Sequence, residues 1–276
     1  MSSLNNTPGL WRHGDGTNLI GVPTGFFGSA DFNDRPSAVH IAGVREINAT
    51  LFQLLPHAAD LAEAAAIFSA YVAAMFDLED RPRPAADTGE ARRYRRSSYL
   101  RLLRGWAYDS NSPEGAVLKG WVESRFGLFP TYHREPLERF DGRAWGRYLE
   151  QKMGSRFHNN AIFSQIDLLY EFAQWALARF FAGQSGRQLY RGVGDFAEHP
   201  IVERIDKRRV ILRLNNLISF TAERDMASWF GDHILETWVP NAKILFFNEL
   251  LPRHPLKGEG EVLAIGGDYR VTASYF

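Results

Sequence analysis

Two glutamates separated by a single glycine are the residues of this chain best suited to chemistry. Glu259 and Glu261 lie in the run GEGEVL (258–263), which continues into a pattern typical of a β strand. Residues i and i+2 of a strand face the same side, about 6–7 Å apart. One carboxylate could therefore stabilise positive charge at a reacting carbon while the other binds and deprotonates a nucleophile. Glu-x-Glu beside glycines is more often a solvated turn, so this pair alone assigns no activity.

Two other short patterns precede the glutamates and could complete a site with them. In LYRG (189–192) an arginine and a glycine follow a short run of strand character. In ISFT (218–221) a serine and a threonine end a strand that is expected to lead into a helix over residues 222–232. Singly, the arginine is more often a surface charge and the Ser-x-Thr a helix cap, with Thr221 as N-cap. The order of all three patterns along the chain indicates a functional set.

This set resembles the arginine-serine-glutamate class of mono-ADP-ribosyltransferases, which includes bacterial toxins and arginine-specific ectoenzymes. That class has an arginine on a first strand, Ser-x-Ser or Ser-x-Thr on a second, and Glu-x-Glu before a later strand. The matching residues here are Arg191, Ser219 with Thr221, and Glu259 with Glu261. The class also carries an aromatic residue downstream of the serine motif, where this chain has Phe230. Threonine stands where many members have the second serine, and it keeps the hydroxyl.

The resemblance implies that NAD⁺ is the substrate and that Glu261 carries the reaction. Cleavage of the bond between ribose and nicotinamide develops positive charge on the ribose, as in glycoside hydrolysis. Glu261 would stabilise that charge, and Ser219 would hold Glu261 in position. Glu259 would bind, orient and deprotonate a target guanidinium, which is a poor nucleophile while it stays protonated. In the class, glutamate at this first position accompanies arginine as acceptor, and the chemistry requires no metal.

The resemblance also implies which residues bind NAD⁺. Arg191 would pair with the pyrophosphate, for which a guanidinium fork is well shaped. Phe230 would lie against the nicotinamide ring, a contact worth about 1 kcal/mol. The NAD⁺-binding set is completed by Gly192, Ser219, Thr221 and Glu261.

A closer resemblance covers nearly the whole chain. The strings GTNLIGVPTG (16–25), DFNDRP (31–36) and HIAGVRE (40–46) are similar to the dinitrogenase reductase ADP-ribosyltransferase family of nitrogen-fixing bacteria. Toxins of the broader class lack these strings. The resemblance implies modification of one arginine on the nitrogenase iron protein, which switches nitrogen fixation off. It also implies a PII-type nitrogen regulatory protein as a second partner.

Composition and spacing argue against several other classes of protein. Lys+Arg and Asp+Glu both count 32, so the basic excess usual in nucleic-acid binders is missing. The chain has no cysteine, and its eight histidines show no metal-ligand spacing. The run GVGDFA (192–197) matches a dinucleotide fingerprint, but Pro200 follows within a few residues and no acid stands at 209–218.

Three alternative functions remain beside the one that the resemblance implies. The chain could be an arginine-specific ADP-ribosyltransferase with a different protein target, or a catalytically silent module that binds NAD⁺ or protein. A glycosidase using both glutamates is disfavoured, because the two carboxylates must flank the scissile bond and these share one side of a strand.

The elements expected to position these residues change character along the chain. Residues 1–45 are expected to form an irregular arm with buried aromatic anchors. Helices are expected over residues 57–80, 92–107, 113–126, 136–152 and 160–182, the last apolar on most faces and therefore central. The prolines of RPRP (81–84) are expected to end the first of these helices. Short strands are expected over residues 188–193, 209–214, 217–220, 243–248, 261–265 and 269–275.

These elements predict an α+β fold in which a helical N-terminal two-thirds packs on a strand-rich ADP-ribosyltransferase-type split β-sandwich. The boundary falls between an arm and helical region, 1–182, and an NAD⁺-binding catalytic region, 183–276, which together are expected to form one compact unit. The N-terminus lacks the features of a secretory signal, and no apolar run approaches the ~20 residues that span a bilayer. A cytoplasmic protein without a membrane span is therefore expected.

Overall fold

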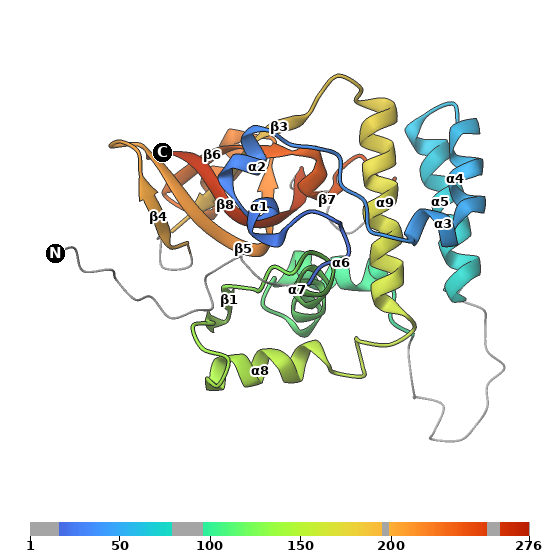
Figure 1. The fold of residues 1–276 in the computed structure, drawn as a ribbon, viewed down its shortest axis with the longest axis horizontal. Helices are drawn as coiled ribbons and strands as arrows, with labels where there is room; N and C mark the ends of the chain where they lie inside the picture. The colour runs from blue at the N-terminus through green and yellow to red at the C-terminus, as the bar shows by residue number, and fades with distance from the viewer. Residues whose placement is uncertain (1–16, 79–95, 195–198, 253–259, 276) are drawn as a thin grey trace.

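The computed structural model describes residues 17–78, 96–194, 199–252 and 260–275, and it shows an α+β chain with most helices first and most strands last (Figure 1). The longer described helices are α5 (Leu61–Phe76), α6 (Tyr99–Tyr108), α7 (Pro113–Phe126), α8 (Arg143–Lys152) and α9 (Ile162–Phe180). The short ones are α1 (Thr24–Phe27), α2 (Ala30–Asp34), α3 (Val44–Ile47), α4 (Ala49–Leu54), η2 (Leu55–His57), α10 (Arg224–Ala227), η3 (Ser228–Phe230) and η4 (Asn241–Lys243). The prediction of an α+β fold is confirmed.

The helical predictions are confirmed in number, but several ends were wrong. Helix α5 ends at Phe76, before the prolines, because Asp77 adopts a left-handed conformation with φ 49°. Helix α8 begins at Arg143 rather than at 136. Glu135–Pro136 form β2, which pairs with β1 (Tyr132–His133), and a turn in which Gly142 N–H donates to the Arg139 carbonyl directly precedes the helix. Helix α7 matches its predicted bounds, since Ser112 caps its start and Gly127 ends it with φ 72°.

The strands of the main sheet differ from the predicted ones in their bounds and partly in their positions. They are β3 (Gly186–Val193), β4 (Ile201–Arg204), β5 (Arg209–Thr221), β6 (His233–Pro240), β7 (Ile244–Phe247) and β8 (Glu261–Tyr275). The predicted strands 209–214 and 217–220 are one strand, β5, which is interrupted by a register shift between Leu214 and Leu217. The predicted strands 261–265 and 269–275 are likewise one strand, β8. Strands β4 and β6 were missed.

The described strands beyond β1 and β2 form one antiparallel sheet that closes on itself. Their order is β4-β5-β3-β6-β8-β7, and β5 also pairs with β8, so that β5, β3, β6 and β8 form a ring. Strands β3 and β6 pair along eight residue positions, whereas β3 and β5 share one pair, Tyr190 with Thr221. Several residue pairs join β3 to β6, β6 to β8 and β8 to β5, whereas a single residue pair joins β3 to β5.

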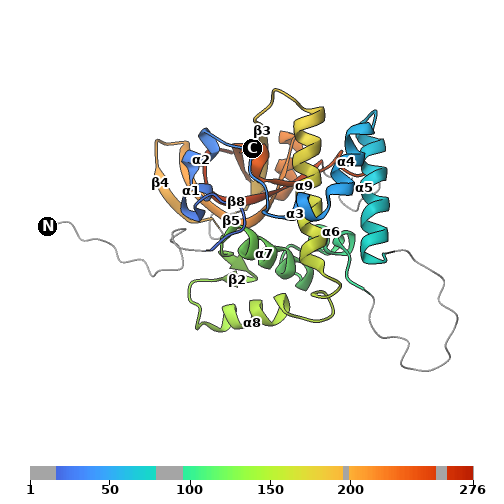
Figure 2. The same ribbon diagram turned by 45° about the vertical axis from the view of Figure 1, so that its right-hand side comes forward.

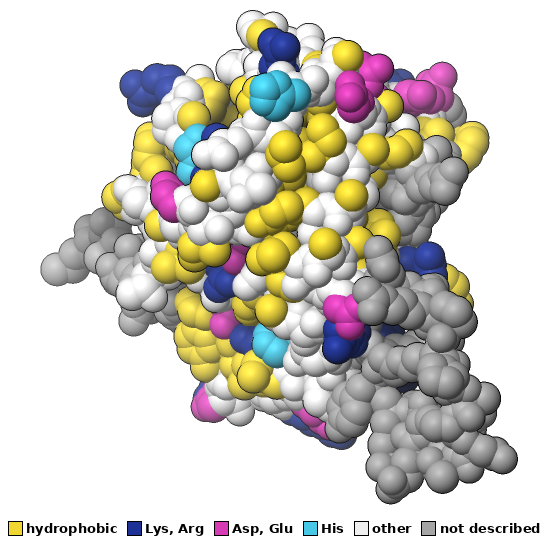
Figure 3. Space-filling model, turned by 90° about the vertical axis from the view of Figure 1, so that its right-hand side faces the viewer, with side chains coloured by type: hydrophobic (Ala, Val, Ile, Leu, Met, Phe, Trp, Pro, Cys, Tyr) yellow, Lys and Arg dark blue, Asp and Glu magenta, His cyan; other side chains and the backbone are white. Residues whose placement is uncertain are grey.

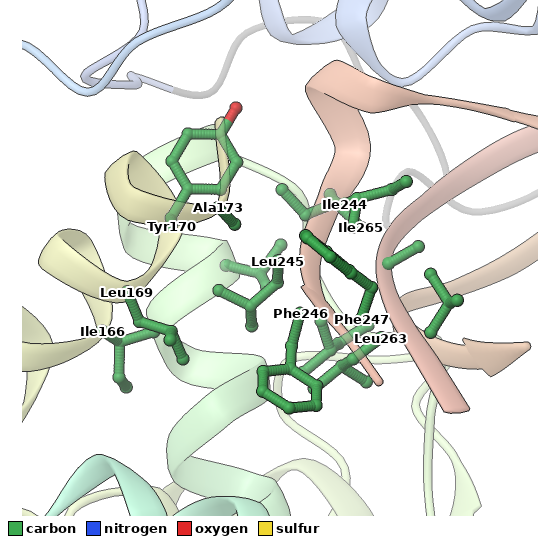
Figure 4. Packing of buried hydrophobic residues seen from close by; sticks show 14 of the residues in the cluster. Ile166, Leu169, Tyr170, Ala173, Ile244, Leu245, Phe246, Phe247, Leu263 and Ile265 are labelled. Carbon is green, nitrogen blue, oxygen red and sulfur yellow. The ribbon is translucent and has the colours of Figure 1, made fainter. Parts of the chain in front are cut away.

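Helix α9 lies between the sheet and the helices α3, α4 and α5 (Figures 1 and 2). It is buried on most faces, as predicted, and packs against β7 with side chains such as Leu169 and Ala173 (Figure 4). Phe172 of α9 stacks on Phe68 of α5 with ring centroids 4.4 Å apart. One hydrophobic cluster runs from these helices into the sheet, so both regions share their core.

The outer face of α3, α4 and α5 has the mixed character of an exposed surface. Hydrophobic side chains run through the middle of this side of the molecule, between scattered charged groups (Figure 3). Ile47, Leu54 and Met75 are the large exposed hydrophobic residues of these three helices. Single exposed apolar side chains of this kind are normal on folded proteins.

The N-terminal arm is anchored by a buried carboxylate. Glu171 of α9 is fully buried and accepts hydrogen bonds from the backbone N–H of Ile41 at 2.6 Å and from Nε of Arg45 at 2.6 Å. The ring Nδ1 of His40 lies 3.0 Å from the same carboxylate. A buried carboxylate must be paired to be tolerated, so this cluster ties residues 40–45 to the central helix.

A buried lysine joins the arm to the closed sheet. The ammonium of Lys243 lies 4.7 Å from the ring centroid of Tyr269, 5.3 Å from that of Phe27 and 5.8 Å from that of Phe32. Its Nζ also donates to the carbonyl of Gly266 at 3.3 Å. The expectation of buried aromatic anchors in the arm is thus confirmed for Phe27 and Phe32. Burial lowers the pKa of Lys243 to about 7.

Raising the pH from about 7 to about 9.5 is expected to stabilise the wild-type chain relative to Lys243→Met. The folded-state pKa of about 7 lies below the usual 10.5, so in this interval the unfolded chain binds the extra proton and stability rises with pH. Because methionine does not titrate, the difference in free energy of unfolding between the two proteins should change by about 3 kcal/mol. Urea unfolding at both pH values measures it. The exposed Lys207→Met serves as control, and an identical pH response of wild type and Lys243→Met would contradict the expectation.

Candidate active site

A cavity of about 310 Å³ opens where β3, β5 and β8 meet helix α6. Its volume lies at the lower end of the range of about 300–1,000 Å³ typical of small-molecule sites. From the sheet it is lined by Tyr190, Arg191, Gly192, Ser219, Phe220, Thr221 and Glu261, and from elsewhere by Trp106, Ala107, Tyr108, Asp109, Ser110, Ala227 and Phe230. The structure thus brings together every predicted site residue except Glu259, which lies outside the described residues.

The strand register places Ser219 beside Glu261. Thr221 pairs directly with Glu261 across β5 and β8, and Ser219 precedes Thr221 by two residues. Alternation along β5 therefore puts the Ser219 and Thr221 side chains on the same face as Glu261, as direct and diagonal neighbours. The hydroxyl of Ser219 donates a hydrogen bond to Oε1 of Glu261. This contact is the one that the Ser-x-Thr and Glu-x-Glu patterns suggested.

Helix α6 supplies a second hydrogen bond to Ser219. The indole Nε1 of Trp106 donates to Oγ of Ser219 at 2.8 Å. An indole N–H can only donate, so the Ser219 oxygen must accept from it, and the hydroxyl proton is directed to Glu261. Trp106, Ser219 and Glu261 thus form a one-way chain of donors ending on a carboxylate that is only 6% exposed.

A buried lysine, Lys119, lies beside the ring of Trp106. The ammonium of Lys119 lies 5.9 Å from the Trp106 ring centroid and donates to Oδ1 of Asn111 and to the carbonyl of Tyr132, both at 3.0 Å. His133 Nδ1 lies 3.4 Å from the same ammonium. Burial, together with the Lys119 charge, lowers the pKa of His133 to about 4, so near neutral pH the ring is uncharged beside Lys119.

Arg191 lies at the gap between β3 and β5. Its Nη1 donates to the carbonyl of Ser219 at 3.0 Å, and its side chain lines the cavity. This hydrogen bond fixes the guanidinium beside the Ser219–Glu261 pair. An anionic group bound in the cavity would therefore meet a planar cation that is already oriented.

Gly192 is a glycine because helix α10 approaches β3 closely. A Cβ at this position would lie 1.9 Å from the carbonyl oxygen of Ala227 and 3.1 Å from the backbone nitrogen of Gly231. Gly231 faces the same constraint, since its Cβ would lie 2.2 Å from the carbonyl carbon of Val193. Close packing between β3 and the segment 227–231 thus explains both glycines.

The predicted helix over 222–232 is much shorter than expected. Helix α10 covers one turn and continues as η3, and Thr221 is the last residue of β5 rather than the N-cap, a position that Glu223 occupies. The Thr221 hydroxyl still accepts from the Glu223 backbone N–H at 3.2 Å, which stabilises the turn. Phe230 lines the cavity from η3 and is 54% exposed, so its ring is accessible to a ligand.

Sequence reasoning missed the contribution of helix α6. Trp106 is 4% exposed, and its hydrogen bond to Ser219 has no signature in a helical spacing. Tyr108 and Asp109 follow at the end of the same helix and also line the cavity. Their positions depend on how α6 packs on α7 and α9, which local sequence does not determine.

The part of the chain that the structure describes lacks two features. Within it, no three His, Asp or Glu side chains are arranged so that they could hold a metal ion. None of its helices combines the length and the apolar character needed to cross a membrane.

Comparison with known proteins identifies the family. The family model of dinitrogenase reductase ADP-ribosyltransferase matches residues 17–273, so the chain belongs to this family. It is 58% identical over 271 residues to the NAD(+)--dinitrogen-reductase ADP-D-ribosyltransferase of Rhodospirillum rubrum, and the alignment covers 97% of each chain. No solved structure matches the chain.

Gly192→Ala is expected to destabilise the protein, because the new methyl group would overlap the Ala227 carbonyl. Overpacking of this kind costs about 1–3 kcal/mol, so the melting temperature should fall by several degrees. Gly194→Ala is the matched control, since nothing lies within 4 Å of a Cβ placed there. Thermal unfolding of both variants measures the effect, and equal melting temperatures would refute the close-packing explanation.

Proposed function

We propose that the chain is a mono-ADP-ribosyltransferase that transfers ADP-ribose from NAD⁺ to an arginine of the nitrogenase iron protein, dinitrogenase reductase. Its family and the name of its Rhodospirillum rubrum relative support this function. The observation that carries it is the buried Glu261, held by Ser219 in a cavity that also presents Arg191. This arrangement combines an oriented carboxylate with an oriented cation, which suits a substrate with a reacting ribose and a pyrophosphate.

Glu261 is the proposed catalytic residue. Positive charge develops on the ribose as the bond to nicotinamide breaks, and a fixed carboxylate stabilises it more in the transition state than in the ground state. The hydrogen bond from Ser219 keeps the carboxylate in place, so little reorganisation is needed during the reaction. The low exposure of Glu261 strengthens its electrostatic effect, because water screens it little.

The remaining cavity residues would bind NAD⁺. Arg191, which lines the cavity, would pair with the pyrophosphate. Phe230 would lie against the nicotinamide ring, for which its exposed ring is available. Thr221 would contribute its hydroxyl beside Glu261, and Gly192 would allow the close approach of the segment that carries Phe230.

Glu259 would act on the acceptor. It precedes Glu261 by two residues, and we propose that it binds the arginine of the target and takes the proton that the guanidinium must lose. Division of the work between two carboxylates would separate cleavage of NAD⁺ from transfer to arginine.

We further propose that the two regions of the chain, 1–182 and 183–276, act as one unit around a split sheet. The shared hydrophobic cluster and the contribution of α6 to the cavity support one unit. The single residue pair between β3 and β5 supports a correspondence between the gap at that position and the split of an ADP-ribosyltransferase-type β-sandwich.

The whole proposal is tested by mixing the protein with labelled NAD⁺ and purified nitrogenase iron protein, with and without an ADP-loaded PII-type protein. Label on an iron-protein arginine, accompanied by loss of iron-protein activity, is the expected result, and a dependence on the PII-type protein would establish it as a partner. Release of nicotinamide without label on the iron protein would indicate a transferase with a different target. Neither label nor release of nicotinamide under either condition would indicate a catalytically silent module.

Glu261→Gln is expected to retain NAD⁺ binding and to lose transfer by about 10²–10³-fold, because the amide keeps the shape but not the charge. Glu259→Gln is the comparison variant, expected to lose transfer to arginine while retaining cleavage of NAD⁺ by water. Calorimetric titration with NAD⁺ and rates of nicotinamide release separate the two. Full transfer activity in Glu261→Gln would exclude it as the catalytic residue, and equal loss of both reactions in Glu259→Gln would contradict the division of work.

Trp106→Phe is expected to lower kcat about five-fold with little change in the KM for NAD⁺. The variant keeps an apolar ring but loses the hydrogen bond that orients the Ser219 hydroxyl, which is worth about 1 kcal/mol. Trp145→Phe is the matched control, because Trp145 is similarly buried in α8 but does not line the cavity. A kcat equal to that of wild type would show that Ser219 needs no orientation by α6.

A further inference from the structure

Helix α6 ends at the cavity with two residues that nothing in the proposed NAD⁺ site uses. Tyr108 and Asp109, here called the α6 end pair, both line the cavity and both are exposed, Tyr108 to 94%. A fully exposed tyrosine ring at the wall of a binding cavity has a free aromatic face. A carboxylate beside it adds a negative charge at the same wall.

The Asp109 carboxylate is oriented by its own turn. Its Oδ1 accepts from the backbone N–H of Asn111 at 2.8 Å, and its backbone carbonyl accepts from the N–H of Ser112 at 2.9 Å, where Ser112 begins α7. Its Oδ2 has no hydrogen bond to any residue that the structure describes. One oxygen thus holds the side chain in place, and the other is available to a ligand.

The cavity has two carboxylates among its described lining residues, and they have different surroundings. Glu261 is buried and accepts a hydrogen bond from the Ser219 hydroxyl, whereas Asp109 is exposed and directly follows α6. Arg191 of β3 is the residue proposed to pair with the pyrophosphate of NAD⁺. A carboxylate such as Asp109 beside the pyrophosphate would oppose NAD⁺ binding, because both groups are negatively charged. Asp109 is therefore better suited to a cationic ligand.

We propose that Tyr108 and Asp109 bind the guanidinium of the target arginine. A guanidinium is planar, stays charged, stacks on aromatic rings and forms charge-assisted hydrogen bonds with carboxylates, so an exposed tyrosine followed by an oriented aspartate matches both of its properties. The inference rests on the proposed function and adds a binding element for the acceptor, supplied by the helical region. It makes the end of α6 a determinant of arginine specificity.

The α6 end pair binds the acceptor and takes no part in proton transfer. During the reaction, one guanidinium nitrogen forms a bond to the ribose carbon as the bond from that carbon to nicotinamide breaks, and the bonding electron pair leaves with nicotinamide. The proton lost from the attacking nitrogen goes to the carboxylate of Glu259 in the proposed division of work. A guanidinium carries five N–H donors, so nitrogens that do not attack the ribose remain able to donate to Asp109.

The test uses full-length protein, NAD⁺ and a small alkylguanidine as acceptor, with the iron protein as a second acceptor. Asp109→Asn and Tyr108→Ala are expected to raise the KM for the alkylguanidine about ten-fold, because each loses a charge-assisted or cation–π contact. The ratio of transfer to cleavage of NAD⁺ by water should fall by a similar factor. Tyr108→Phe keeps the ring and should recover most of the transfer that Tyr108→Ala loses. Asp141→Asn, at an exposed aspartate that does not line the cavity, controls for loss of surface charge.

Four other outcomes would overturn the inference, and they are distinguishable. A raised KM for NAD⁺ with an unchanged KM for the alkylguanidine would assign the α6 end pair to NAD⁺. A raised KM for the iron protein alone would assign it to docking of the protein surface. No change with either acceptor would leave it without a role in recognition. If wild-type protein cleaves NAD⁺ but modifies neither acceptor, arginine specificity itself is wrong and the inference falls with the proposed function.

Discussion

The arrangement of the cavity depends on keeping one carboxylate charged and fixed while it is almost entirely buried. Removing a carboxylate from water is costly unless hydrogen bonds replace the lost hydration. Glu261 receives the hydroxyl of Ser219, and Ser219 in turn receives the indole N–H of Trp106. Each donor comes from a different element, so β8, β5 and α6 must all be in place for the carboxylate to be oriented. This requirement explains why the strand-rich region carries the motif residues while the helical region completes their environment.

The same reasoning applies to two further buried charges that join distant parts of the chain, Glu171 and Lys243. Glu171 is satisfied by residues of the N-terminal arm, and Lys243 by aromatic rings of the arm and of β8. Two segments that resemble the family contribute to these clusters. Phe32 of DFNDRP (31–36) lies near Lys243, and Ile41 of HIAGVRE (40–46) donates to Glu171. Their contacts are with the central helix and the sheet, so their first role is to hold the arm on the scaffold around the cavity.

Local pattern was sufficient for much of the fold. Helix α7 had strong capping signals, and α9 had a long apolar pattern, so both were predicted correctly. Strand β5 was divided in two because its register shift at Leu214–Leu217 interrupts the alternation, although hydrogen bonds to β8 continue on both sides. Helix α8 was begun too early, because the β1–β2 pairing that stops it is a contact between segments. These two errors arose because contacts between distant segments, rather than the local residues, determine where β5 and α8 begin and end.

The site shows the same division between local and long-range information. Alternation along a strand was enough to group Ser219 with Thr221, and motif order was enough to pair them with Glu261. The contact itself needs the register in which Thr221 opposes Glu261, forty residues later in the chain, and this register is a property of the folded sheet. Trp106 has no motif, because the spacing that buries its ring does not show where its N–H points. Sequence therefore identified the residues that line the cavity from the sheet, and the structure added Trp106, which donates a hydrogen bond to Ser219.

The narrow closure between β3 and β5 links the shape of the sheet to the position of Arg191. The two strands share the pair Tyr190–Thr221, and one residue further along β3 the Ser219 carbonyl accepts from the Arg191 side chain. The Arg191 side chain bridges the two strands at the place where they separate. Its guanidinium therefore connects β3 to β5 and also lines the cavity. Beyond it, Gly192 lets the α10 segment pack against β3 and bring Phe230 to the cavity. A sheet that stayed paired along its full length would have no room for this cavity, so the break in pairing is the structural condition for having a site there.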